Sequence, residues 1–220
     1  MSQIALPLGS GAGTGPSRIV VGNANAAVLD AFANAVAWPF RTAVLAGPPR
    51  SGKSLLARWF TETGKGEAID DADRMDEAEL FHRWNRAQEG GQPLLLVSSA
   101  GEGAWKIALP DLASRIGAAL HLEIGAPDDA MLAELIALHA EMRGLVLDDS
   151  AAAYLVPRCE RSHLGVELLV ATIDRLSLER KQAPTMAIWR EALAEVTGAN
   201  VTGPNVTGSN VTGKGQPRLP

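Results

Sequence analysis

The sequence predicts an α/β fold in which a parallel sheet is covered by helices, followed by a small all-helical domain. Strand-like and helix-like runs alternate over residues 17–124, a pattern typical of parallel sheets. One strand–helix pair flanks a phosphate-binding motif, the P-loop. Strand character disappears after residue 126, where helical spacing of apolar residues takes over. With 220 residues, 46% of them hydrophobic, the chain can build one α/β core and a second small domain.

The composition divides the chain into four zones. Residues 1–16 are rich in Gly, Pro and Ser, and we expect them to be flexible apart from one apolar cluster. Residues 17–125 form the expected α/β domain, and residues 126–195 form the expected helical domain. Residues 196–220 repeat Asn-Val-Thr-Gly with a five-residue period, which predicts a disordered tail. The Asn-x-Thr triplets match glycosylation acceptors, but we expect no secretory route for this chain.

The first strand of the expected sheet, Thr42–Ala46, leads into the pattern G-x-x-x-x-G-K-[ST], and a helix-like run, Leu55–Phe60, follows it. In a P-loop the backbone N–H groups surround a phosphate, and the helix dipole adds to the attraction. We expect Lys53 to reach the β- and γ-phosphates and the Ser54 hydroxyl to bind Mg²⁺. An ordinary glycine-rich turn is the alternative, but the flanking strand and helix favour nucleotide binding. The predicted nucleotide-binding residues here are Gly47, Pro48, Pro49, Arg50, Ser51, Gly52, Lys53, Ser54 and Leu55.

A short strand ending in acidic residues follows, within Gly66–Asp73. This arrangement fits a Walker B motif, in which Asp70 binds Mg²⁺ mostly through water and Asp71 acts as a base or orients water. A solvated acidic turn is the alternative, since the strand has few apolar residues. Only one helix fits between Lys53 and Asp70, so the sheet should be one strand–helix pair short.

The remaining elements follow from apolar spacing and capping residues. A helix over Asp76–Gln88 and strands at Pro93–Ser99 and Ala119–Ile124 complete the expected sheet domain. Several helices of the second domain begin with Asp, Ser or Thr, which are suitable N-caps. The four predicted helices are Asp128–Arg143, Ser150–Arg158, His163–Glu179 and Thr185–Ala194.

Charge and composition exclude several kinds of protein. The net charge of −5 and the pI of about 5.4 argue against a surface that binds the phosphate backbone of nucleic acids. The single Cys159 excludes an internal disulfide and a cysteine-based metal site. No signal peptide and no apolar run of about eighteen residues is found, so we expect a cytoplasmic protein without membrane contact. The four histidines, His82, His121, His139 and His163, form no metal or catalytic pattern and are interpreted as structural.

A sheet domain with P-loop and Walker B motifs, followed by a helical lid, resembles the AAA+ ATPases. Over residues 17–195 the chain is similar to the DnaA-related members, in the same order of motifs. Ile19–Asn25 looks like the segment that lines the adenine pocket in that family, which implies nucleotide contacts from Val21, Gly22 and Asn25. Leu94–Ser99 falls where those proteins carry sensor 1, so Ser99 or Ser98 would take that role. Leu109–Arg115 is similar to the family's arginine-finger box, which implies that Arg115 is the finger.

Two parts of DnaA have no counterpart in this sequence, namely the helix-turn-helix domain and the long N-terminal domain. Near the N-terminus, Gln3, Leu6, Pro7 and Leu8 look like the Q-x-x-L-P-L peptide that binds the bacterial sliding clamp, the beta subunit of DNA polymerase III. Physically, the peptide offers one amide and two leucines, held extended by the proline. A disordered terminus with chance leucines is the alternative. The combination resembles the Hda-type regulators, which act in regulatory inactivation of DnaA.

The resemblance implies a negative regulator of chromosomal replication initiation that binds ADP or ATP with Mg²⁺. It would contact the clamp and DnaA, would reach DNA only through the clamp, and would stimulate hydrolysis of DnaA-bound ATP through Arg115. The sequence leaves open which nucleotide is the working ligand and whether the chain forms a homodimer. Two other functions also remain open: a DnaA-like ATPase that acts as a loader on DNA or a helicase, and a nucleotide-binding adaptor without effect on hydrolysis.

The sequence departs from the family at two positions that bear on hydrolysis. The sensor 2 arginine is replaced by Glu167 in the apparent register, with Arg161 or Arg158 as substitutes from a neighbouring turn. Sensor 1 is a serine, which can donate a hydrogen bond but carries no charge. Both departures predict that this chain hydrolyses ATP weakly, as expected of a regulator that acts on the ATPase of DnaA.

Overall fold

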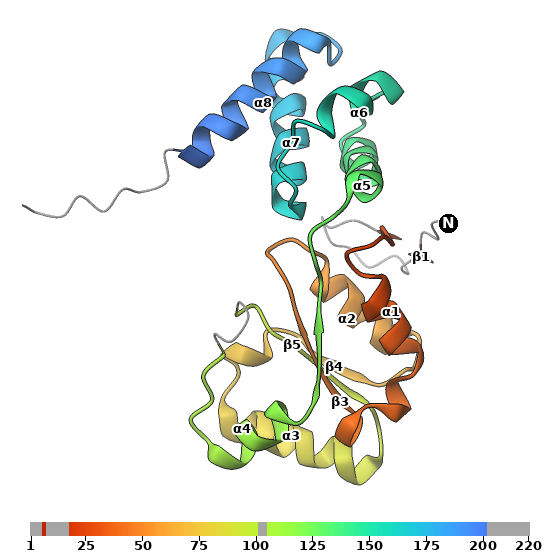
Figure 1. The fold of residues 1–220 in the computed structure, drawn as a ribbon, viewed down its shortest axis with the longest axis vertical. Coiled ribbons are helices and arrows are strands. Elements are labelled where there is room, and N and C mark those ends of the chain that lie inside the picture. Colours follow the sequence, from red (N-terminus) through yellow and green to blue (C-terminus); the bar gives the residue numbers. More distant parts are fainter. Residues whose placement is uncertain (1–5, 8–17, 101–104, 202–220) are drawn as a thin grey trace, which may run out of the picture.

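A four-stranded parallel sheet forms the centre of the first domain in the computed structural model, which describes residues 6–7, 18–100 and 105–201 (Figure 1). The strand order is β4-β5-β3-β6, with β3 and β5 in the middle. One helix separates β3 from β4 along the chain, so the predicted fold class, one strand–helix pair short, is confirmed. The strands are β3 (Thr42–Ala46), β4 (Glu67–Ile69), β5 (Leu94–Val97) and β6 (Leu120–Glu123).

Alternate side chains of the two central strands enter two separate cores, one on each face of the sheet. Leu45 and Leu95 pack into one core together with residues of α1 and α2. Val44 and Leu96 pack into the other core together with residues of α3 and α4. Every residue of β5 is buried, because a parallel sheet is covered on both faces. The four helices are α1 (Ala26–Ala33), α2 (Lys53–Glu62), α3 (Glu77–Gly90) and α4 (Pro110–Gly117).

The weakly apolar sequence of β4 reflects its position at the edge of the sheet. β4 pairs only with β5, and just one of its three residues is buried. Three 3₁₀ turns complete the domain: η1 (Ala35–Ala37), η2 (Pro39–Arg41) and η3 (Ala72–Arg74).

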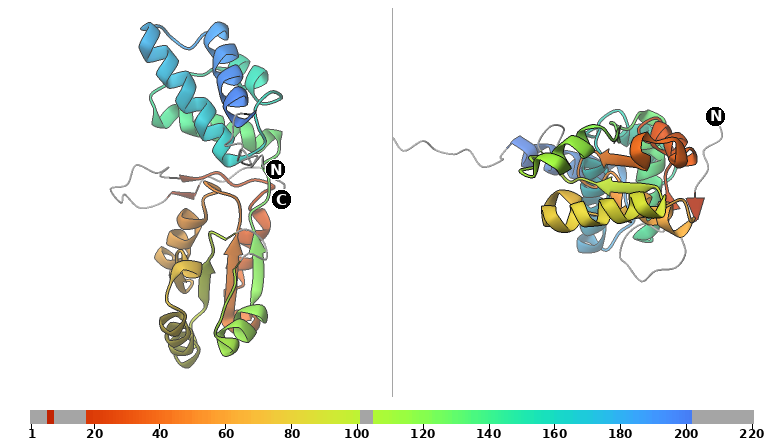
Figure 2. Two further views of the ribbon diagram at one scale, coloured as in Figure 1. Left: turned by 90° about the vertical axis from the view of Figure 1, so that its left-hand side faces the viewer. Right: turned by 90° about the horizontal axis from the view of Figure 1, so that it is seen from below.

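The second domain consists of four helices, which lie beyond one end of the sheet domain in both Figure 1 and Figure 2. Asp128, the predicted first residue of its helix, is an N-cap, because its side chain accepts a hydrogen bond from the Met131 N–H. The next two caps are Asp148 and Ser162, whereas the prediction began those helices at Ser150 and His163. The helix α7 packs against both α5 and α8. The helices are α5 (Asp129–Met142), α6 (Asp149–Leu155), α7 (His163–Arg180) and α8 (Met186–Val201).

Two predicted helix ends differ from the structure. The prediction extended α6 to Arg158, but the helix ends at Leu155, since Pro157 has no N–H with which to continue the hydrogen bonding of the helix. The helix α8 continues to Val201, beyond the expected domain end at residue 195, so the low-complexity composition does not stop it at once.

Part of the predicted flexible N-terminus forms a strand. β1 (Leu6–Pro7) pairs antiparallel with β2 (Arg18–Ile19), so Leu6 and Pro7 of the expected clamp-binding peptide have an extended backbone. Gln3 and Leu8 of that peptide, and the Asn-Val-Thr-Gly repeats from residue 202 on, lie outside the described residues. None of the described helices is both long and apolar enough to cross a membrane.

An aromatic cluster packs α1 and α2 onto the sheet. Phe32 is only 1% exposed, and its ring centroid lies 5.0 Å from that of Phe60 and 6.0 Å from that of Trp38. We predict that Phe32→Ala lowers the free energy of unfolding by about 3–5 kcal/mol, because it leaves a cavity that this packing cannot fill. Urea unfolding would measure the loss. The control Val36→Ala, at a 73% exposed site, should change stability little, and an equally small effect at Phe32 would contradict the cluster's importance.

Candidate functional site

The P-loop connects the carboxyl end of β3 to α2, which begins at Lys53. Two glycines of the loop have backbone conformations that suit glycine, with φ of 155° at Gly47 and 87° at Gly52. A Cβ on Gly47 would lie 2.9 Å from the Ile124 side chain, so the loop also needs a small residue there. Arg50 adopts a left-handed conformation as well, with φ of 63°.

Two side chains of the loop have groups suited to phosphate. Lys53 Nζ donates hydrogen bonds to the carbonyl oxygens of Gly47 (2.8 Å) and Pro48 (3.0 Å). Burial lowers the pKa of Lys53, while the carboxylates of Asp70 and Asp71 act in the opposite direction. The Ser51 hydroxyl is buried, with the residue only 5% exposed, and its Oγ has no hydrogen-bond partner among the described residues. A buried hydroxyl without a partner beside an ammonium group fits a site for a phosphate group.

The acidic turn after β4 meets the end of β5, its neighbour in the sheet. Ser99 Oγ donates a hydrogen bond to Asp71 Oδ1 over 2.6 Å, so the structure brings together the predicted sensor 1 and Walker B residues. Asp70 and Asp71 are both exposed. Ser98 is buried instead, and its backbone N–H donates to the carbonyl oxygen of Leu45 in β3. Ser99, rather than Ser98, therefore faces the acidic turn.

Asp73 is a further residue of this turn, which the sequence analysis did not select. Its carboxylate accepts hydrogen bonds from the backbone N–H groups of Ser99 (2.9 Å) and Ala100 (3.1 Å). It thereby joins η3 to the segment after β5. The only sequence signal for this role is a third acid in the same short run.

The predicted adenine-pocket segment lies at the junction of the two domains. Asn25 is 2% exposed, and its side-chain amide bonds backbone groups at both ends: Oδ1 accepts from Gly22 N–H, and Nδ2 donates to the Val20 carbonyl. Asn25 thus fixes the backbone conformation of this segment through two side-chain hydrogen bonds. Gly22 lies against the lid, since a Cβ there would come within 2.9 Å of Met131 Sδ. Val21 is half-buried beside it.

One ion pair connects the P-loop directly to the lid. Arg50 Nη2 lies 2.6 Å from Glu167 Oε1 on α7. Glu167 is the residue at the apparent sensor 2 position, so the lid turns a carboxylate toward the loop, and the loop supplies the guanidinium. The two suggested substitutes have partners within the lid: Arg161 bonds Asp129, and Arg158 lies over the ring of Tyr154. Sequence reasoning selected Arg50 only as a loop residue and missed its pairing.

Two histidines of the lid are affected by these charges, His163, which is buried, and His139, which is half-buried. His163 begins α7 and is 4% exposed, and His139 lies on α5. Burial is the largest cause that lowers the pKa of each imidazole. For His163 the charge of Lys53 contributes in the same direction, whereas the Glu167 carboxylate raises the pKa of His139. Burial therefore favours the neutral form of both rings.

Arg115 belongs to the last turn of α4, a helix at the end of the sheet domain that is away from the lid (Figure 1). The strand after it, β6, starts at Leu120 opposite Ala43, whereas the P-loop follows the far end of β3. The guanidinium stacks on two rings of α3, 4.2 Å from the centroid of Trp84 and 4.5 Å from that of Phe81. Its Nη1 also donates to Asn85 Oδ1 over 2.5 Å.

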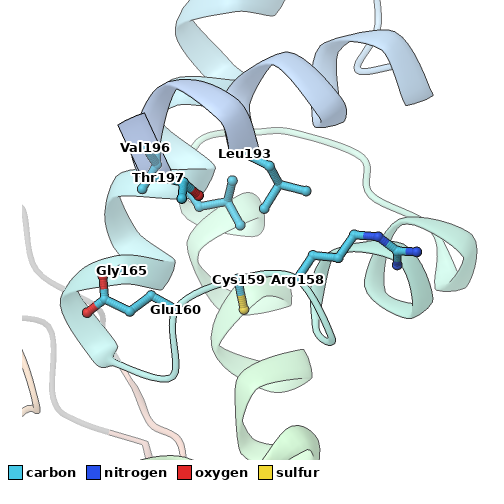
Figure 3. Close-up of a pocket in the computed structure, with 8 residues that line it drawn as sticks. Arg158, Cys159, Glu160, Gly165, Leu193, Val196 and Thr197 are labelled. Atoms are coloured by element: carbon cyan, nitrogen blue, oxygen red, sulfur yellow. The ribbon is translucent and has the colours of Figure 1, made fainter. Parts of the chain in front are cut away.

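A pocket of about 250 Å³ lies within the lid, apart from the P-loop (Figure 3). The loop after α6 and the helices α7 and α8 line it, and its lining includes Arg158, the suggested sensor 2 substitute, but no residue of the P-loop or the acidic turn. Cys159 is one of the lining residues, and burial raises the pKa of its thiol. The pocket is therefore separate from the candidate nucleotide site.

Solved structures with this fold include DNA-associated proteins of Thermotoga maritima. Domain III of its replication initiation protein DnaA is 14% identical, with a TM-score of 0.65, over 81% of this chain and 94% of that chain. Its RuvB Holliday junction branch migration motor is 21% identical, with a TM-score of 0.59, over 80% of this chain and 70% of that chain. A replication initiator DnaA bound to AMPPCP and single-stranded DNA gives a TM-score of 0.57 at 16% identity, over 74% of this chain and 66% of that chain. These likenesses show the AAA+ fold.

For the helical domain, a protein-family model gives a more specific match than the solved structures do. Residues 128–193 match the family model "Hda, lid domain". The chain therefore combines a fold shared with DnaA domain III and a helical domain similar to the Hda lid. An uncharacterized protein of Haemophilus influenzae is 27% identical over 118 residues, which cover 53% of this chain and 51% of that protein. The chain thus aligns with about half the length of this relative.

The lowered pKa values of His139 and His163 predict a loss of stability of the protein on acidification. Their pKa values lie below the ordinary 6.5, so the unfolded chain binds these protons first as the pH falls. The free energy of unfolding should therefore be constant above about pH 7 and should fall as the pH drops through about 6.5. The charged groups that act on the pKa of one or the other ring are Glu167, Arg143, Arg50 and Lys53.

Urea unfolding at about pH 7.5 and about pH 5.5 would measure this loss. Replacing both His139 and His163 by Phe should remove most of the pH dependence, whereas replacing the exposed His82 by Phe should leave it unchanged. An equal pH dependence in all three proteins would contradict the assignment to His139 and His163.

Proposed function

We propose that this protein is a nucleotide-bound negative regulator of replication initiation, which binds the sliding clamp and stimulates hydrolysis of DnaA-bound ATP. The observation that carries the proposal is the match of residues 128–193 to the Hda lid domain, on a fold similar to that of DnaA domain III. DnaA and the beta subunit of DNA polymerase III are the proposed partners. DNA is contacted only through the clamp, in keeping with the net charge of −5.

The proposed ligand is ADP or ATP with Mg²⁺. The loop Gly47–Gly52 and Lys53 would hold the phosphates, supported by the partnerless Ser51 hydroxyl. Ser54 and Asp70 would hold the metal ion, which neutralises phosphate charge when bound. Val21 and Gly22 would border the adenine at the domain junction, with Asn25 maintaining the shape of that segment.

We infer that this chain hydrolyses its own nucleotide slowly. The Asp71 carboxylate, the candidate base, is engaged by the Ser99 hydroxyl. The lid places the Glu167 carboxylate near the P-loop. Negative charge would develop there during hydrolysis, and a cation would stabilise it whereas a carboxylate would not. Both features favour a regulator that retains its nucleotide. They argue against the alternative function of a DnaA-like ATPase that acts as a loader on DNA or a helicase.

Arg115 is the proposed finger, and its position supports action on a partner only. Its guanidinium is near the amino-terminal end of β6, away from the chain's own P-loop. The rings of Phe81 and Trp84 limit its rotamers, so less side-chain entropy is lost when it engages a phosphate on DnaA. A planar, permanently charged group suits the transferring phosphoryl group.

Arg115→Ala should therefore keep nucleotide affinity and clamp binding but lose the stimulation of DnaA. An arginine finger supplied in trans contributes about 10³–10⁵ in rate in well-studied GTPases, so even a weak one gives a measurable loss. Arg115→Lys should fail as well, because an ammonium lacks the planar fork. The assay measures ADP formed on DnaA with DNA-loaded clamp. Equal rates with wild type and both variants would exclude Arg115 as the finger. Absence of stimulation by wild type would favour an adaptor without effect on hydrolysis.

The segment containing Gln3, Leu6, Pro7 and Leu8 is the proposed clamp-binding peptide. Its described residues, Leu6 and Pro7, are extended, as recognition of a peptide in an apolar groove requires. Replacing Gln3, Leu6 and Leu8 by Ala should abolish capture by immobilised clamp and leave ADP affinity unchanged. The matched control is Arg115→Ala, which should still be captured. Clamp capture that survives the triple substitution would assign the attachment to another surface.

A further inference from the structure

The helix α4, which carries Arg115, has no side-chain N-cap of its own. It begins at Pro110, and Leu109, the residue at the N-cap position, makes no capping hydrogen bond, since a leucine side chain has no acceptor. Backbone N–H groups at the start of a helix have no partner within that helix. Acceptors for them have to come from another element or from solvent.

Glu77, the first residue of α3, supplies such an acceptor. Its two carboxylate oxygens accept hydrogen bonds from consecutive backbone N–H groups, Oε1 from Ala108 over 2.8 Å and Oε2 from Leu109 over 2.6 Å. The start of α3 has a different cap, because the Asp76 side chain accepts a hydrogen bond from the Glu79 N–H. The Glu77 carboxylate thus serves α4 rather than its own helix, and its charge lies near the positive end of the α4 dipole.

The other end of α4 contacts the same helix through Arg115. The guanidinium stacks on the rings of Phe81 and Trp84, and Nη1 donates a hydrogen bond to Asn85, all on α3. Between these two ends, apolar side chains of both helices pack into one core (Figure 1). Apolar burial is non-directional, so it limits sliding of α4 along α3 less than hydrogen bonds of defined geometry do. The two hydrogen bonds to Glu77 therefore set the position of α4 along α3.

We propose that Glu77 is the positioning residue of Arg115: its carboxylate holds the start of α4 and thereby sets where the guanidinium is presented to DnaA. Leu109 and Arg115 are six positions apart, about 9 Å along a helix, so a shift at the start of α4 also moves Arg115. Misplacing a catalytic group by about 1 Å can lower a rate about 10²-fold. The inference rests on the proposed function in one respect, namely that Arg115 acts as the finger on DnaA-bound ATP.

Glu77→Ala removes both acceptor oxygens. With DNA-loaded clamp, the maximal rate of ADP formation on DnaA should fall about tenfold or more. The concentration of this protein that gives half-maximal stimulation should stay within about twofold, since the loss concerns the transition state and not binding. ADP affinity and capture by immobilised clamp should equal those of wild type. Glu77→Gln has nearly the same shape and keeps one acceptor oxygen, so its maximal rate should lie between those of wild type and Glu77→Ala.

Asp76→Ala is the matched control. It removes the neighbouring carboxylate, which caps α3 through the Glu79 N–H. Loss of a cap should lower the melting temperature by about 2–4 °C in a chain of this size, but the maximal rate should equal that of wild type.

A double substitution tests the link to Arg115 directly. In an Arg115→Ala background, Glu77→Ala should lower the remaining rate no further, because a positioning residue has no effect once the residue that it positions is removed.

The outcomes distinguish failure of this inference from failure of the proposed function. If wild type stimulates DnaA and Glu77→Ala reaches the same maximal rate, the inference is overturned. Equal losses in Glu77→Ala and Asp76→Ala, or a further loss in the Arg115→Ala background, would assign the effect to stability and would also overturn it. If Glu77→Ala does not fold, Glu77→Gln takes its place in these comparisons. If Arg115→Ala stimulates like wild type, or wild type does not stimulate, the proposed finger fails, and this inference with it.

Discussion

The pairing of β3 with β5 on one side and β6 on the other is the constraint on which the rest of the structure depends. Because all four strands are parallel, their carboxyl ends meet at one edge of the sheet. The P-loop, the acidic turn, Ser99 and the connection to the lid all follow those ends. A substitution that disturbs β3 would therefore displace every part of the candidate site, although no side chain of β3 belongs to that site.

An ion pair, in addition to apolar packing, connects the lid to this edge of the sheet. The Arg50 guanidinium stands on the P-loop and its carboxylate partner, Glu167, stands on the lid. An exposed ion pair contributes little to stability, typically below about 1 kcal/mol, so its importance lies in orientation. It holds the first turn of α7, and with it His163, over the loop.

The opposite end of the sheet domain carries a second, independent arrangement. Arg115 stacks on Trp84 and Phe81 far from the P-loop, so the proposed nucleotide site and the proposed arginine finger lie at opposite ends of the sheet. This separation is consistent with the proposal that the arginine acts on a partner and not on this chain's own nucleotide.

The sequence by itself determined the elements of secondary structure and the local shape of the P-loop. Apolar spacing, capping residues and the glycine pattern are local properties, so the strands, the four lid helices and the turn at Gly47 and Gly52 could be predicted. Errors occurred where local signals compete, as at the end of α6, which Pro157 stops early, and along α8, which continues into a low-complexity segment.

Only the tertiary structure decided which side chains meet. The bond between Ser99 and Asp71 exists because β5 lies beside β4 in the sheet, which chain order alone does not state. The pairing of Arg50 with Glu167 spans 117 positions and depends on how the lid docks. His163 was interpreted as structural from the sequence. Its neighbours along the chain do not indicate that its ring is buried without a hydrogen-bond partner among the described residues. Contacts between distant elements depend on docking geometry, and no periodic pattern encodes that geometry.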